Sequence, residues 1–173
     1  MITTGSESYD AVVSLPVTVV LENLRSLHNV GSFFQTADAA RVEALVLGGF
    51  TGTPPRKEIA KTALGAEDVV SWEHAAEPLD AVTALRARQY EIAVIETGLH
   101  AIDLFDWRPR FPVCVVFGNE LEGLSPGLVA AADTQIRIPM LGLKHSLNVA
   151  VAGGIVIYEL LRKYRQLVQG SIW

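Results

Sequence analysis

The chain has 173 residues, half of them hydrophobic and 19% charged, which fits one folded domain and excludes a disordered tail. Its 14 basic and 19 acidic side chains give a net charge of −5, which argues mildly against generic nucleic-acid binding but leaves room for a local basic patch. The mean hydropathy of +0.30 is high for a soluble monomer and predicts a large core, or a core plus an apolar oligomer interface.

Predicted strands and helices alternate along the chain. Apolar runs predict strands at 17–24, 44–49, 68–72, 91–97, 113–118 and 134–139. Helical spacing and capping residues predict helices at about 32–40, 57–64, 78–88, 125–132 and 146–169. This alternation implies an α/β fold, with a mostly parallel sheet and helices on both faces, in one domain over residues 1–173. Ligands of such sheets bind at the carboxyl ends of the strands, so the loops after Thr97, Gly118 and Pro139 are the informative ones.

The last predicted helix is apolar around nearly its whole circumference in its first half. Such a helix must be buried on all sides, so one side is expected on the sheet and the other on a partner subunit. Two adjacent glycines, Gly153 and Gly154, weaken the helix by about 1 kcal/mol each and make sense where another backbone approaches closely.

Several common sites are missing from the sequence. It has no G-x-G-x-x-G after the first strand, no phosphate-binding P-loop and no H-E-x-x-H zinc motif. The four histidines are scattered, and the single cysteine, Cys114, lies in an apolar run and is expected to be a buried core thiol, so no metal is expected. No apolar run reaches the roughly 20 residues that cross a bilayer, and no secretion signal is seen, so we expect a cytoplasmic protein without membrane contact.

Two loops remain as candidates for a site. Residues 115–125 lead from a buried strand through Glu120 and Glu122 to a helix, and residues 138–154 lead from another strand into the long helix, with Ser146 as its expected N-cap. Two interpretations carry about equal weight: ordinary capped connections, or one site. Their place on the same sheet edge favours a site, with an apolar hollow lined by Ile138, Met140, Leu143 and Leu147.

Three motifs occur in order: NLRSLHNVGSFFQTADA, VFGNELEGLS and IPMLGLKHSLNVAVAGGI. With them the chain resembles the SpoU (TrmH) family of RNA ribose 2′-O-methyltransferases in the SPOUT superfamily. That resemblance implies a C-terminal trefoil knot, over about residues 113–165, which no general rule of topology would predict. It also implies S-adenosylmethionine held bent in the knot loops, an RNA substrate (tRNA or rRNA), and a homodimer whose active site is shared between subunits.

Site residues follow from the resemblance, position by position. The residues that match the catalytic motifs are Asn29, Gln35, Glu120, Ser146 and Asn148. The residues expected against the cofactor are Thr97, Gly118, Ile138, Met140 and Leu147.

Gln35 departs from the family pattern, which reads N-x-G-x-x-x-R and has an arginine at this position. Arginine holds a phosphate and an oxygen together with its rigid fork, whereas glutamine lacks both the charge and the fork. Losing assistance to the reacting hydroxyl costs about 10²–10⁴-fold in rate. Arg25, Arg41 or an arginine of the partner subunit are the candidates to replace it.

Three functions therefore stand as hypotheses. The first is a cofactor-dependent RNA 2′-O-methyltransferase. The second is a member of the same family that binds cofactor and RNA but has weak or lost catalysis because of Gln35. The third is a knotted scaffold that acts through protein contacts, suggested by the acidic balance.

Overall fold

The computed structural model describes residues 13–98 and 100–168. Seven strands form one sheet in the order β3-β2-β1-β6-β4-β7-β5, and each of its neighbouring pairs is parallel. The strands are β1 (Leu15–Glu22), β2 (Val42–Gly48), β3 (Trp72–Ala75), β4 (Glu91–Ile95), β5 (Ile102–Asp103), β6 (Val113–Phe117) and β7 (Thr134–Arg137). The α-helices are α2 (Leu27–Ala39), α3 (Lys57–Ala63), α4 (Pro78–Ala87), α5 (Pro126–Ala131) and α6 (Val149–Leu167). The predicted α/β class is thus confirmed.

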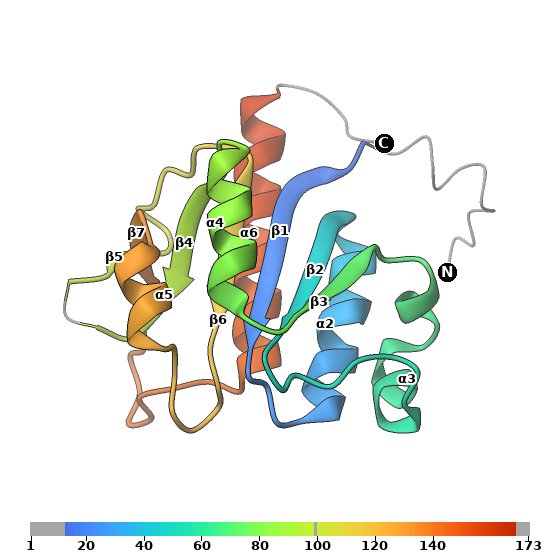
Figure 1. Ribbon diagram of the computed structural model, residues 1–173. Coiled ribbons are helices and arrows are strands. Elements are labelled where there is room, and N and C mark those ends of the chain that lie inside the picture. The colour runs from blue at the N-terminus through green and yellow to red at the C-terminus, as the bar shows by residue number, and fades with distance from the viewer. Residues whose placement is uncertain (1–12, 99, 169–173) are drawn as a thin grey trace.

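The sheet is buried on both faces because alternate side chains of its central strands enter two different cores. In β1, Val19 and Leu21 pack with α2, α3 and α6, whereas Val20 packs on the opposite face with α4 and α5. Figure 1 shows α4 and α5 in front of the sheet and α6 behind it. The carboxyl ends of the strands point to the lower edge of that view, where the loops that follow them lie.

Two predicted elements were placed wrongly. The strand expected at 68–72 is a single 3₁₀ turn, Ala66–Asp68, followed by β3 from Trp72, because Gly65 turns the chain with a φ of 94°. The helix expected to begin near Ser32 begins at Leu27, where the hydroxyl of Ser26 caps it by accepting from Asn29 N–H at 3.2 Å. The earlier start puts Asn29 in the first turn of α2, next to the strand ends.

Helix α6 also differs from its prediction. Its N-cap is Asn148 and not Ser146, and its predicted end at Gln169 lies outside the described residues. A Cβ added at Gly153 would lie 2.3 Å from the ring of Phe33, so this glycine admits an aromatic ring of α2, not another backbone. A Cβ at Gly154 would meet no atom of residues 13–98 or 100–168 within 4 Å, so contacts among these residues do not explain this glycine.

The structure argues against a reactive cysteine, a metal site and a membrane-spanning helix in the described residues. Cys114 is fully buried in β6, and desolvation raises the pKa of its thiol to about 12, which makes it the expected inert core residue. Among residues 13–98 and 100–168, no group of three or more His, Cys, Asp or Glu side chains could hold a metal ion. No helix in the same ranges is long and apolar enough to cross a membrane.

Candidate active site

A cavity of about 450 Å³ opens at the carboxyl ends of β4, β6 and β7 and reaches the start of α6. All five residues expected against the cofactor line it: Thr97, Gly118, Ile138, Met140 and Leu147. Leu143, expected in the same hollow, does not line it: it is 96% exposed and precedes the part of the loop, residues 145–148, that lines the cavity. We call this hollow the strand-end cavity.

The wall of the cavity after β6 is a tight loop. Asn119 and Gly123 exchange two backbone hydrogen bonds, of 3.0 and 2.9 Å, and Gly123 has a φ of 71°. A Cβ at Gly118 would lie 2.5 Å from the carbonyl carbon of Gly123 and 2.6 Å from Leu124 N. Gly118 is therefore required where two stretches of backbone lie against each other.

Buried polar side chains brace this loop, and sequence reasoning missed them. Asn119 donates to the Asn23 carbonyl at 2.7 Å and accepts from Leu121 and Glu122 N–H groups. The buried carboxylate of Glu22 accepts from Ser125 N–H at 2.8 Å. The contacts with Asn23 and Glu22 join residues 96 and 103 positions apart in the sequence. Their position was the one usable signal in the sequence, because Glu22 is the last residue of β1 and Asn119 comes two residues after the end of β6.

Three of the predicted catalytic side chains form a hydrogen-bonded chain, in which Glu120 and Asn148 line the cavity and Asn29 joins them from α2. The Asn29 amide nitrogen donates to Glu120 at 3.2 Å, and the Asn148 amide nitrogen donates to the Asn29 carbonyl oxygen, also at 3.2 Å. Asn148 is fixed in turn because its own oxygen accepts from Ala150 and Val151 N–H groups as the cap of α6. Ser146 lines the same cavity without a place in this chain.

Glu120 is an anchor of this chain rather than a proton acceptor. Partial burial alone would raise the pKa of its carboxyl, but hydrogen bonds from the backbone N–H groups of Arg25, Glu120 itself and Ser26, and from the Asn29 amide, lower it overall. The carboxylate is therefore ionised at neutral pH and already occupied by donors. Such a group orients Asn29 well and is a weak general base.

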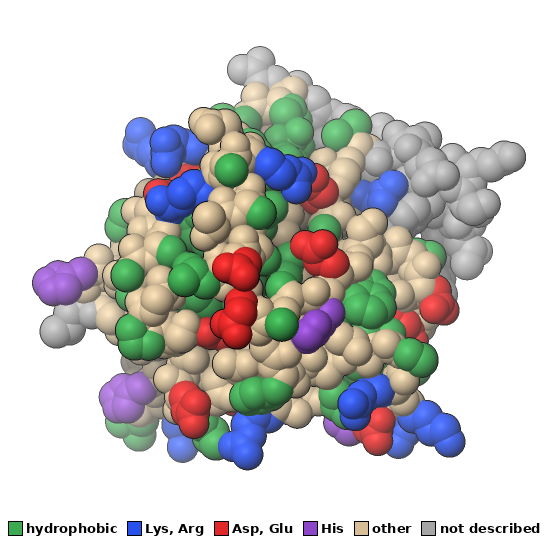
Figure 2. Space-filling model, viewed as in Figure 1, with side chains coloured by type: hydrophobic (Ala, Val, Ile, Leu, Met, Phe, Trp, Pro, Cys, Tyr) green, Lys and Arg blue, Asp and Glu red, His purple; other side chains and the backbone are tan. Residues whose placement is uncertain are grey.

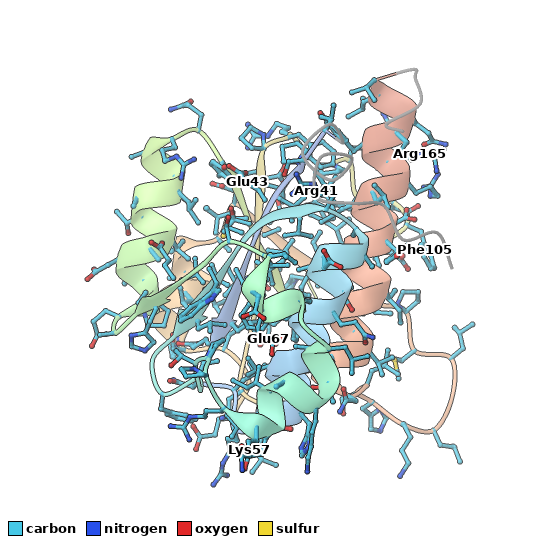
Figure 3. All side chains as sticks on the ribbon, turned by 90° about the vertical axis from the view of Figure 1, so that its right-hand side faces the viewer. Arg41, Glu43, Lys57, Glu67, Phe105 and Arg165 are labelled. Carbon is cyan, nitrogen blue, oxygen red and sulfur yellow. The ribbon has the colours of Figure 1, made fainter. Side chains whose placement is uncertain are left out.

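Gln35 lies apart from these residues. It is exposed on α2, lines neither described cavity, and is about 9 Å further along the helix axis than Asn29. Of its candidate replacements, Arg41 directly precedes β2 and therefore lies at the opposite edge of the sheet from the cavity. Its carbonyl accepts from Leu15 N–H at the start of β1. Figure 3 shows Arg41 high in the molecule, well away from Lys57 at the strand-end edge. Arg25 is the better candidate of the two, because its backbone N–H donates to Glu120.

Residues 123–127 also fit G-x-S-x-G, the spacing of a hydrolase nucleophile elbow. In such an elbow the serine sits on a sharp turn directly after a strand, but Ser125 comes eight residues after the end of β6. No histidine in the described ranges hydrogen-bonds its hydroxyl. The structure does not support a hydrolase site here.

Comparisons with known proteins agree with this geometry. Residues 16–158 match the SpoU rRNA Methylase family. The tRNA (guanosine(18)-2′-O)-methyltransferase of Escherichia coli strain K12 is 32% identical over 147 residues, covering 85% of this chain and 63% of that protein. The chain spans 61 to 63% of the length of the first three curated relatives.

Solved structures give the same result. The A. aeolicus TrmH/SpoU tRNA modifying enzyme matches with a TM-score of 0.83 at 28% identity, over 93% of this chain and 81% of that one. An AdoMet-bound rRNA methyltransferase from Sinorhizobium meliloti matches with a TM-score of 0.79 at 28% identity, over 87% and 60%. With the sheet, the strand-end cavity and the family motifs in agreement, the chain belongs to the SpoU rRNA Methylase family.

Proposed function

We propose that the protein binds S-adenosylmethionine in the strand-end cavity and methylates a ribose 2′-hydroxyl of tRNA or rRNA, in the cytoplasm. The observation that carries the proposal is the position of the Glu120–Asn29–Asn148 chain at the rim of that cavity. Relatives named as tRNA and rRNA guanosine 2′-O-methyltransferases support the reaction class.

The cavity fits the cofactor by size and by chemistry. Its volume of about 450 Å³ is within the usual range for small-molecule sites. Ile138, Met140 and Leu147 provide apolar contact, whereas Thr97 and the backbone around Gly118 provide polar groups. When bound, S-adenosylmethionine would supply a methyl group on a sulfonium: the sulfonium C–S bond would break as the ribose C–O bond forms, leaving a neutral thioether and passing the hydroxyl proton to water.

The hydrogen-bonded side chains of Glu120, Asn29 and Asn148 act mainly by aligning the ribose hydroxyl with the methyl group. Asn148 and Asn29 hold their amides in fixed directions because Glu120 and the first turn of α6 anchor both ends. Alignment of a nucleophile with a reactive electrophile supplies several kcal/mol of barrier reduction without a strong base. Ser146, exposed at the same wall, offers a hydroxyl that can contact the ribose.

We propose that two protomers pair through α6 and that the knot lies within residues 113–165. The outer face of α6 carries Val151, Ile155 and Tyr158, which are 53, 36 and 49% exposed. An apolar helix face of this kind is stabilised by a partner.

Gly154 gives the sharpest test of this dimer. Because a Cβ at Gly154 meets nothing within 4 Å in the protomer, Gly154→Leu is expected to fold but to block a close partner. We expect sedimentation to change from dimer to monomer at micromolar concentration, with far-UV circular dichroism unchanged. A wild-type chain that already sediments as a monomer, or a variant that stays dimeric, would contradict the proposal.

The second candidate function, binding of cofactor and RNA with weak catalysis, is supported by Gln35 and its exposure. We expect Gln35→Arg to raise methyl transfer by roughly tenfold or more, since it restores a charged bidentate donor at a position that RNA can reach. The measurement is the initial rate with saturating cofactor, and Gln166→Arg, an exposed site near the far end of α6, is the matched control. Equal rates in all three proteins would show that position 35 has no part in the reaction.

Calorimetry tests the cofactor site directly. We expect S-adenosylmethionine or its demethylated product to bind in the micromolar range, about −8 kcal/mol. A protein that gives neither a heat of binding nor a shift in melting temperature with either ligand would refute both hypotheses, the methyltransferase and the protein that binds cofactor and RNA with weak catalysis.

A further inference from the structure

A second cavity, of about 550 Å³, lies beside the strand-end cavity at the ends of β1 and β2. Its lining includes Arg25, Phe50 and Arg56, and also Asn119 and Glu122 of the loop after β6. Asn119 lines both cavities, so one loop is the wall between them.

Phe50 is unusual because it is an aromatic ring, 63% exposed, on a firmly held loop. Phe50 N–H donates to the Asn23 side chain at 3.0 Å. The next residue, the buried Thr51, donates to the Leu21 carbonyl at 2.9 Å and accepts from Leu24 N–H at 3.0 Å. Folding gains little from an exposed ring, so a backbone that holds one at a cavity mouth favours a role in binding a flat apolar partner.

Two cations accompany this ring. The guanidinium groups of Arg25 and Arg56 are exposed and form no ion pair in the part of the chain that the structure describes. Glu122 adds one carboxylate to the same lining. An aromatic platform with two unpaired arginines is the combination that binds a base and its phosphates, and a carboxylate can accept from base N–H groups.

The rest of the surface agrees with an approach from this edge. Figure 2 shows the face covered by α4 and α5 with acidic side chains near its middle. Basic side chains appear along the lower edge of that view, where the strands end, with some acidic ones among them, and others lie along its upper part. An anionic chain is therefore repelled from the middle of that face, whereas the edge that holds both cavities offers basic side chains to it.

We propose that the second cavity binds the nucleotide next to the methylated one, with its base on Phe50 and its phosphates on Arg25 and Arg56. This inference rests on the proposed methyl transfer, because the neighbouring position is defined by a ribose at the Glu120–Asn29–Asn148 chain. Arg25 joins the two places, since its backbone N–H donates to Glu120 at 3.1 Å while its side chain lines the second cavity. The bound segment must be unpaired RNA, because bases stacked in a duplex cannot reach a side-chain ring.

The test compares variants of the second cavity with matched distant ones. Phe50→Ala and Arg56→Ala remove the ring and one cation, and Phe50→Trp keeps a platform. The controls are Phe105→Ala, a ring 61% exposed near β5, and Arg165→Ala, an exposed cation near the end of α6. Figure 3 shows Phe105 and Arg165 on the α6 side, away from Lys57, the neighbour of Arg56. Each protein is titrated with total tRNA and total rRNA from cells that lack the gene, and separately with S-adenosylmethionine.

We expect Phe50→Ala to weaken RNA binding about tenfold and Phe50→Trp to restore it. Arg56→Ala should weaken binding and lower the salt slope by about one. Both controls should bind RNA as the wild type does, and every variant should keep its cofactor affinity. Wild-type affinity for RNA in Phe50→Ala and Arg56→Ala would overturn this inference and leave the methyl-transfer proposal standing. A wild-type protein that binds cofactor but no RNA would overturn both.

Discussion

Replacing Asn148 by alanine is expected to lower methyl transfer by at least about 100-fold, because the link between Asn29 and the start of α6 is lost. The same change removes the N-cap of α6, which costs about 1 kcal/mol of stability. Rates with saturating cofactor and urea unfolding separate the two effects.

Asn148→Asp is the matched control for this prediction. Aspartate keeps the oxygen that caps Ala150 and Val151 N–H groups and caps helices about as well as asparagine, but it lacks the donor to Asn29. We expect Asn148→Asp to retain the free energy of unfolding and lose activity as the alanine variant does. Wild-type rates in Asn148→Asp would show that the donor is dispensable.

Gly118→Ala is expected to lower cofactor affinity at least about tenfold and to destabilise the fold by about 1–3 kcal/mol. The added Cβ would overlap backbone atoms of Gly123 and Leu124, so the loop that forms the cavity wall must move as a whole. Calorimetry with S-adenosylmethionine and thermal unfolding measure the two effects.

Gly127→Ala provides the comparison, because its Cβ would lie 3.7 Å from Leu79, an ordinary contact, within α5. In a helix this change is neutral or stabilising by up to about 1 kcal/mol. Unchanged cofactor affinity in Gly118→Ala would remove the strand-end cavity from the cofactor site.

The sheet was predictable because its central strands are continuous apolar runs with a clear alternation of helices between them. The strand predicted at 68–72 was wrong for a physical reason. Val70 is buried although it lies in a turn after the 3₁₀ helix, and a short apolar run looks the same in the sequence whether it forms a buried turn or a strand. The two-residue β5 carries too little pattern to detect.

The site was predictable in outline, since parallel strands bring their carboxyl ends to one edge and family motifs fall there. The spacing of motif residues in the sequence does not say where on a helix each side chain lies relative to the site. Gln35 shares the spacing of a motif with Asn29, yet its place on α2 sets it apart from the chain that Asn29 forms. The braces from Glu22 and Asn119 depend on contacts between distant segments, which no local pattern encodes.

The most direct test of the account is the transfer itself. The protein is incubated with S-adenosylmethionine carrying a deuterated methyl group and with total tRNA and rRNA from cells that lack the gene, and the nucleosides are analysed by mass spectrometry. The account predicts a labelled 2′-O-methyl nucleoside that Asn148→Asp fails to produce. Label on a base, or no labelled nucleoside from a protein that binds the cofactor, would contradict it.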